Sequence, residues 1–213
     1  MLDPRWAWQS TSATMTLPDD RLRRVLENQG YRELISAHLF ATGVPLAPTI
    51  DDKQMLANHA REELHHFEVV STRYEDLGGQ RLFETVSPRT HDAPVPRSWL
   101  ETAVAGYLFD RAVSVQLFAY KKLGDARLDA LVDEILEHEN EHQAAAETAL
   151  LDECRSNPGS VKAAGSHVVY WYRVAVDVLD DSGRGGVLEE YRASIQATLK
   201  ACGLAVPASP GGA

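Results

Sequence analysis

Two Glu-x-x-His motifs are the residues in this sequence whose spacing suggests chemistry. One runs from Glu63 to His66 and the other from Glu139 to His142. Residues three apart in an α-helix lie on the same face within one turn, so each Glu and His can bind the same metal ion. The motif is short enough to arise by chance, and its surroundings must therefore decide its meaning.

The surroundings favour an interior position for both motifs. Most residues three, four or seven positions away are apolar, as expected for a helix face that packs into a core. These neighbours are Leu56, Ala60, Phe67 and Val70 around the first motif, and Val132, Ile135, Leu136 and Ala146 around the second. An overlapping pair, Glu62 and His65, shares its face with polar residues. We expect His65 to face solvent.

Two further carboxylates, Glu33 and Asp110, each precede one of the motifs. No basic residue lies on the helix face around Asp110, and Arg111 points about 100° away from it. Glu33 also lies on a face made of apolar and small residues. A buried carboxylate without a partner is costly, and coordination to a metal ion is one way to compensate for that cost.

Together these side chains are four carboxylates and two imidazoles, the ligand set of a carboxylate-bridged dinuclear site in a four-helix bundle. The four negative charges balance two divalent ions. Oxygen and nitrogen ligands without thiolate suit iron or manganese better than structural zinc. We therefore predict two iron ions that react with O2, with manganese or a mixed Mn/Fe pair as alternatives. The predicted ligands are Glu33, Glu63, His66, Asp110, Glu139 and His142.

Residues beside the ligands are candidates for supporting roles. Glu62 and His138 each precede a ligand and are candidate hydrogen-bond partners of the metal ligands. The candidates for the wall of a substrate pocket are Gly30, Ala37, Phe40 and Tyr107, although plain core packing would explain them equally simply. We expect no part in the site for the remaining histidines, His38, His59, His91 and His167.

Capping residues and glycines define the helices that must position the six ligands. A Ser, Thr or Asp before an apolar periodic stretch predicts a helix start, and a Gly predicts an end. The predicted ligand helices cover residues 18–41, 49–77, 98–123 and 125–153. Residues 80–97 are rich in Pro and Thr, which favours a long crossover with about one helical turn.

The last part of the chain predicts two more helices, over residues 160–181 and 187–201. The fold class is then all-α, a four-helix bundle with two extra C-terminal helices. We expect residues 1–213 to form a single domain, with an ordered core at about 18–203 and short tails.

Composition excludes several classes of function. The net charge of −10 argues against a broad nucleic-acid surface, which requires basic patches. Neither a signal peptide nor a membrane-length apolar stretch is found. Cys154 and Cys202 lack the spacing of a metal or redox motif, so no disulfide is expected. These features predict a soluble cytoplasmic protein without nucleic-acid or membrane partners.

Several segments resemble a known family. The stretches REELHHFEVVSTRYEDLGG, YLFDRAVSVQLF and HENEHQ, together with EYRASIQATLKACGLAVP, are similar to the catalytic subunit of the bacterial phenylacetyl-CoA monooxygenase and its ferritin-like relatives. The likeness covers about residues 25–207. The family's diiron ligands map onto the six residues predicted above. Because partner subunits of this family have lost ligands, the full set resembles the catalytic kind.

The resemblance implies a non-haem diiron oxygenase with a ferritin-like fold. Such an enzyme uses O2 and electrons from a separate reductase to hydroxylate, epoxidise or otherwise oxidise a small organic substrate. A homodimer or hetero-oligomer is the expected assembly. The chain is shorter than the epoxidase subunit and is not rich in basic residues for a CoA phosphate. The resemblance is therefore not extended to phenylacetyl-CoA itself.

Other functions use the same ligands. A ferritin-like or rubrerythrin-like protein would oxidise iron or remove peroxide, although no Cys-x-x-Cys rubredoxin motif is present. A non-catalytic subunit of an oxygenase complex is disfavoured by the complete ligand set. A ferritin-like tRNA hydroxylase is disfavoured by the acidic charge. An oxygenase should have an apolar cavity that reaches the metals, whereas a ferroxidase should have a polar path for iron.

Overall fold

The computed structural model describes residues 16–179 and 186–208, and it confirms an all-α fold. No strand occurs in these two ranges. The long helices are α1 (Asp19–Gly43), α2 (Ile50–Asp76), α4 (Trp99–Lys121), α5 (Ala126–Ser156), α6 (Val161–Asp177) and α7 (Val187–Ala201). Short helical segments are α3 (Leu82–Val86) and the 3-10 turns Val44–Leu46, Ser87–Thr90 and Pro158–Ser160.

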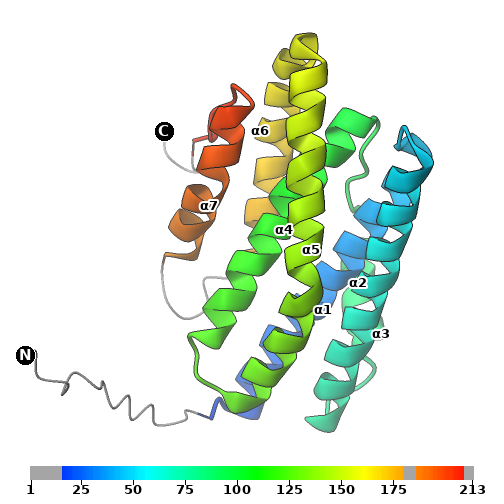
Figure 1. Ribbon diagram of the computed structural model, residues 1–213. Helices are drawn as coiled ribbons and strands as arrows, with labels where there is room; N and C mark the ends of the chain where they lie inside the picture. Colours follow the sequence, from blue (N-terminus) through cyan, green and yellow to red (C-terminus); the bar gives the residue numbers. More distant parts are fainter. Residues whose placement is uncertain (1–15, 180–185, 209–213) are drawn as a thin grey trace, which may run out of the picture.

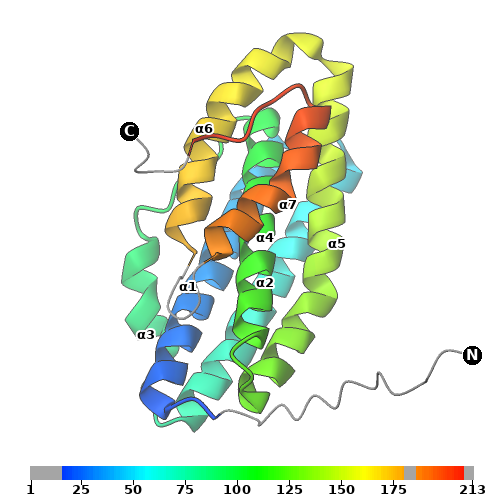
Figure 2. The same cartoon turned by 90° about the vertical axis from the view of Figure 1, so that its left-hand side faces the viewer.

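Helices α1, α2, α4 and α5 form an elongated four-helix bundle (Figure 1). The chain runs along α1, returns along α2, crosses back over the length of the bundle through α3, and then follows α4 and α5 (Figures 1 and 2). Helix α1 packs chiefly against α2, and α4 packs chiefly against α5. Contact between α2 and α5 is far less extensive. The bundle therefore consists of two tightly packed helix pairs.

The predicted capping residues explain where these helices begin. The side chains of Thr49, Ser98 and Asp125 accept hydrogen bonds from backbone N–H groups in the first turns of α2, α4 and α5. After α4, Gly124 has a φ of 71°, a conformation that costs a side-chain-bearing residue energy. The sequence signals for the ligand helices are thus satisfied in the structure.

Helix α4 is buried on nearly every side, because α6 and α7 cover the face that points away from α1 and α2 (Figure 2). The cover includes Trp171, whose indole N–H donates to Glu101, and Tyr191, whose hydroxyl donates to the Leu108 carbonyl. The two predicted C-terminal helices therefore surround the helix that carries Asp110.

The observed bounds of the ligand helices lie within three residues of the predicted ones, and two other segments differ more. Helix α6 ends at Asp177, four residues before the predicted end, and Asp181 lies outside the described residues. The crossover is more helical than expected, because α3 is followed directly by a 3-10 turn. Leu82 of α3 anchors it: a Cβ on Gly30 of α1 would lie 2.7 Å from Leu82 Cδ2. The missing side chain at Gly30 thus lets the crossover pack closely.

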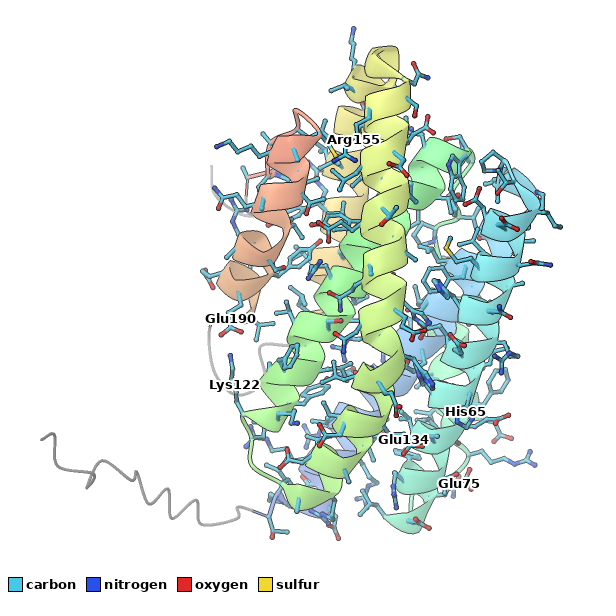
Figure 3. All side chains as sticks on the ribbon, viewed as in Figure 1. His65, Glu75, Lys122, Glu134, Arg155 and Glu190 are labelled. Atoms are coloured by element: carbon cyan, nitrogen blue, oxygen red, sulfur yellow. The ribbon has the colours of Figure 1, made fainter. Side chains whose placement is uncertain are left out.

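Charged side chains on the outer faces follow the expected pattern. His65 and Glu75 project from the outer surface of α2, and Glu134 projects from α5 (Figure 3). Lys122 at the end of α4 contacts Glu190 of α7, with 2.7 Å between Nζ and Oε2. Among the described helices, none is both long and apolar enough to cross a membrane. Both cysteines are buried and free.

Candidate metal centre

The six predicted ligands all lie in the interior of the bundle, one from α1, two from α2, one from α4 and two from α5. Each of their side chains is at most 1% exposed, although all six are ionisable. The buried residues are Glu33, Glu63, His66, Asp110, Glu139 and His142. Such burial of carboxylates is rare unless they have partners.

Four of these side chains converge tightly. Glu33, Glu63, His66 and Glu139 each offer one ligand atom, and these atoms lie within 4.8 Å of one another. His66 Nδ1 lies 3.6 Å from Glu33 Oε2 and 3.6 Å from Glu63 Oε2. It lies 4.0 Å from Glu139 Oε1. This four-residue group brings together three carboxylates and one imidazole from three helices.

The other two residues flank this group. His142 Nδ1 lies 3.0 Å from Glu63 Oε1, so the Glu63 carboxylate lies between the two imidazoles. Asp110 is not one of the four converging residues. It is close enough for charge interactions with His142 and Glu63 to affect its pKa. The structure therefore places five ligands in direct proximity and the sixth, Asp110, beside them.

Most polar atoms of this cluster have no hydrogen-bond partner within the described chain. The orphaned atoms are Glu33 Oε2, both carboxylate oxygens of Glu63 and of Glu139, Asp110 Oδ2, and Nδ1 of His66 and of His142. Native proteins rarely leave so many buried polar atoms unpaired. The atoms come from one cluster and are all metal-binding types, so the donor set fits metal ions.

Basic side chains do not provide the missing partners. In the described ranges, no Lys or Arg forms an ion pair with the four carboxylates. The buried Arg32 donates instead to the Val178 carbonyl and the Tyr120 hydroxyl, and Arg111 pairs with Glu147. Two divalent cations would balance the four carboxylate charges.

Burial dominates the electrostatics of the metal-free cluster. It raises the pKa of Glu33 to about 7 and that of Asp110 to about 8, because a charged carboxylate loses its hydration. Burial and the neighbouring carboxylates also raise the pKa of Glu139 well above its ordinary value. Burial acts on Glu63 in the same direction, but the adjacent imidazoles of His142 and His66 lower its pKa to about 2.

The same interactions favour the protonated forms of the two histidines. Burial opposes the charged form of His66, but the adjacent carboxylates of Glu33 and Glu63 raise its pKa to about 10. In the same way, Glu63 raises the pKa of His142 to about 9. Protons therefore hold the positive charge that metal ions would bring, and metal binding must displace them.

The predicted supporting residues, Glu62 and His138, contact the outward-facing nitrogens of the histidines. His66 Nε2 lies 2.9 Å from His138 Nδ1, and His142 Nε2 lies 2.8 Å from Glu62 Oε2. These contacts leave Nδ1 of both rings facing the carboxylates. A hydrogen bond on the outer nitrogen fixes the orientation of a ligating imidazole and raises its basicity.

A further support was not predicted. Gln29 Nε2 donates to Glu33 Oε1 over 2.7 Å, and Arg32 Nη1 lies 3.4 Å from Gln29 Oε1. Gln29 is one helical turn from Glu33 on the same face, a spacing that could have identified it. The sequence did not indicate that Arg32 would be buried here, because its partners Tyr120 and Val178 are distant in sequence.

His59, which was not assigned to the site, also lies against it. Its ring centroid is 4.0 Å from that of His142, and Phe40 contacts both rings. His59 lies one turn before Glu63, at the same spacing that links Gln29 to Glu33. It lines a small cavity of about 20 Å³ together with Phe40, Leu56, Ala103 and Gly106.

Of the four residues proposed for a pocket wall, only Phe40 lines this cavity. Gly30 instead faces Leu82, as described above. Burial raises the pKa of the Tyr107 phenol, and the groups that modulate it are Thr198 and Arg111, toward α7 rather than the carboxylates. Ala37 is buried but does not line the cavity. The assignment of Gly30, Ala37 and Tyr107 to a pocket wall stays a prediction, since helix periodicity does not distinguish a cavity wall from packed core.

Comparison with known proteins agrees with the fold. No curated protein matches the sequence. A model of the ferritin-like domain of actinomycetes matches residues 20–184, which include all four bundle helices and the six clustered residues. The match covers well over half of the chain, so this protein belongs to the family of ferritin-like domains of actinomycetes.

Proposed function

We propose that this protein is a non-haem diiron enzyme that uses O2 and external electrons to oxidise a small organic substrate. The observation that carries the proposal is the buried cluster of orphaned carboxylate oxygens and imidazole nitrogens. The ligands would be Glu33, Glu63, His66, Asp110, Glu139 and His142. Iron bound there would supply the electrons and coordination positions that O2 activation requires.

The chain's own contribution is to hold the ligands and to exclude water. Gln29, Glu62 and His138 orient Glu33, His142 and His66. A hydroxylation of this class balances as RH + O2 + 2e⁻ + 2H⁺ → ROH + H2O, with a separate reductase protein as the electron donor. Manganese, or one ion of each metal, would suit the same oxygen and nitrogen donors.

The apolar cavity beside the cluster favours an organic substrate. Its wall is formed mainly by aliphatic and aromatic side chains, such as Phe40, Leu56 and Ala103, and it reaches the ring of His59 next to His142. Pockets that position organic molecules have this mixture of apolar walls and few polar groups. A complete ligand set also fits a catalytic subunit resembling that of phenylacetyl-CoA monooxygenase better than a silent partner subunit.

A ferroxidase is the second candidate, and the small size of the cavity favours it. A volume of about 20 Å³ holds little more than one water-sized molecule. An organic substrate would therefore require side chains at the cavity to move. A ferroxidase would need only a path for ferrous ions and O2.

Iron loading followed by O2 consumption distinguishes the two. The metal-free protein is loaded anaerobically with ferrous iron, the iron per chain is counted, and O2 is then added with and without a chemical reductant. The proposal predicts about two irons per chain. It also predicts sustained O2 consumption only with reductant. A ferroxidase would consume O2 as long as ferrous iron is supplied and would accumulate many ferric ions per chain.

A further inference from the structure

A surface groove leads toward the metal centre along the seam where α2 and α5 make little contact. The groove has a volume of about 520 Å³ and is lined by residues of α2, α4 and α5. Its inner end shares Met55, Trp99 and Ala149 with the small cavity beside the cluster. These three residues form a constriction between the groove and the cavity. Groove, constriction and cavity together outline a path from the surface to His59.

The inner cavity is mainly apolar, and its polar lining residues are His59 and Thr102. Leu56, Ala103 and Gly106 contribute to its wall, and an added Cβ on Gly106 would lie 3.8 Å from both Ala146 Cβ and Phe40 Cε1. There is therefore room for an extra carbon atom in this wall. Once neighbouring side chains move to enlarge the cavity of about 20 Å³, this wall of small residues on α4 and α5 would suit the end of a hydrocarbon chain.

His59 gives an independent indication that the cavity receives a ligand. Its side chain is only 8% exposed, and its imidazole forms no hydrogen bond to another residue in the described ranges. Its ring lies against the rings of Phe40 and His142, and the charges of Glu62 and Glu63 also act on it. The ring nitrogens are therefore available to a ligand or water in the cavity that can hydrogen-bond to them.

The outer groove is acidic and therefore favours positively charged ligands. Asp52, Asp152 and Glu153 line it, and no Lys, Arg or His does. Asp52 is engaged with the Thr49 hydroxyl, and Asp152 lies 3.7 Å from the exposed Arg155. An exposed pair at this distance is weak, so the groove remains attractive to cations. Asp152 lies ten residues after His142 on α5, about 15 Å along the helix axis.

We propose that this path binds an amphipathic organic cation, an alkylammonium compound, with its ammonium group at the acidic groove and its hydrocarbon chain directed through the constriction toward the metal centre. This inference rests on the proposed function and names the substrate class for it. A ferrous ion fits the path less well, because the cavity beyond Ala149 offers apolar walls that would strip its hydration.

Binding to the metal-free and the iron-loaded protein tests the inference without relying on turnover. Isothermal titration calorimetry compares octylamine, octanol and octanoate, which share a chain length and differ in charge. We expect octylamine to bind at least about tenfold more tightly than octanoate, with octanol between them. Equal binding of the three, or no binding of octylamine, would overturn the inference.

Matched substitutions on α5 locate the site. Ala149→Leu fills the constriction and should weaken octylamine binding about tenfold or more, while about two irons per chain remain bound. Ala130→Leu makes the same change near the start of the same helix, where it lines a different pocket, and should leave octylamine affinity unchanged. Gly106→Leu fills the inner cavity and should act like Ala149→Leu, so one misfolded variant does not end the test.

Removing the charges tests the groove separately. Asp152→Asn combined with Glu153→Gln should remove most of the preference for octylamine over octanoate. If the preference remains, the acidic groove is not the cation site. If Ala149→Leu slows ferrous iron loading without affecting octylamine, the path carries iron and the inference is wrong. If wild-type protein binds octylamine but no iron, the proposed function fails while the binding site stands.

Discussion

The two helix pairs contribute the same types of ligand but support them differently. The α1–α2 pair provides Glu33 and the Glu63–His66 motif, and the α4–α5 pair provides Asp110 and the Glu139–His142 motif. In the first pair, the Glu33 carboxylate accepts a hydrogen bond from Gln29 and lies within the four-residue group. In the second, Asp110 lies outside that group with Oδ2 unpaired.

This difference indicates that the two proposed metal positions would not be equally preorganised. The four-residue group already brings donors from Glu33, Glu63, His66 and Glu139 to one place. The second position needs Asp110, whose side chain is one methylene shorter than that of a glutamate. Preorganised ligands cost less to order on binding. We therefore expect the first iron to bind more tightly than the second.

The largest effect is expected from Glu63, because its carboxylate lies between both imidazoles and serves both positions. Glu63→Ala should reduce bound iron from about two per chain to fewer than one. Iron analysis after anaerobic loading and desalting measures this, and circular dichroism checks that the variant is folded. Full iron occupancy in a folded Glu63→Ala protein would contradict the shared role.

Removing one carboxylate charge from each helix pair tests most directly whether the two pairs differ. Asp110→Asn should keep the tighter iron and lose the weaker one, since the four-residue group is intact. Glu33→Gln should weaken the tighter iron, since it alters that group. Anaerobic titration with ferrous iron resolves the two binding phases. Identical titration curves for the two variants would show that the positions are equivalent.

The outer partners of the histidines should have a smaller effect. Removing such a partner typically costs about 10–100-fold in metal affinity. Glu62→Gln should cost more than His138→Asn, because a carboxylate at the outer nitrogen of His142 is a stronger hydrogen-bond acceptor than an imidazole at the outer nitrogen of His66. Competition with a metal chelator measures both affinities. The reverse order would indicate that Glu62 acts through another contact.

The smallest expected effect is a pH dependence of the metal-free protein. The raised pKa values of Glu33, Asp110 and His142, about 7, 8 and 9, mean that the folded state holds protons that the unfolded state releases. Their stabilising contribution is present at low pH and is lost as pH rises through these values. The pKa of His59 is lowered from 6.5 to about 4, so this residue affects the stability of the folded state only below about pH 6.5. The Tm should therefore fall by several degrees between about pH 6.5 and 9.

The same measurement separates the two helix pairs. Glu33→Gln should remove the part of the Tm loss that is complete by about pH 7, and Asp110→Asn the part that continues to about pH 8. Iron-loaded wild-type protein should show little of this loss, because the carboxylates are then ligands rather than proton acceptors. A Tm of the metal-free protein that stays constant or rises over this range would contradict the assignment of the buried charges.

Sequence periodicity was sufficient to predict the helices and the inward direction of the six clustered residues. The caps at Thr49, Ser98 and Asp125 are local signals, and a Glu-x-x-His pair on an apolar face is defined within one turn. For the same reason, Glu62 could be singled out by its position next to a ligand.

Features that depend on contacts between helices could not be predicted. The pairing of Arg32 with Tyr120, and of Gly30 with Leu82, joins residues far apart in sequence. The position of Asp110 beside the four-residue group, rather than in it, depends on how α4 packs between the other helices. Which side chains surround Tyr107 depends on such contacts too, since the groups that affect its phenol come from α4, α5 and α7.

The most direct test of the central claim is the number of irons held by the buried cluster. Metal-free protein is titrated anaerobically with ferrous iron, and bound iron per chain is counted for the wild type and for Glu63→Ala. We predict about two irons per wild-type chain, bound in two phases of unequal affinity, and fewer than one in the variant. Wild-type protein that binds no iron, or an iron count that Glu63→Ala leaves unchanged, would contradict the diiron assignment.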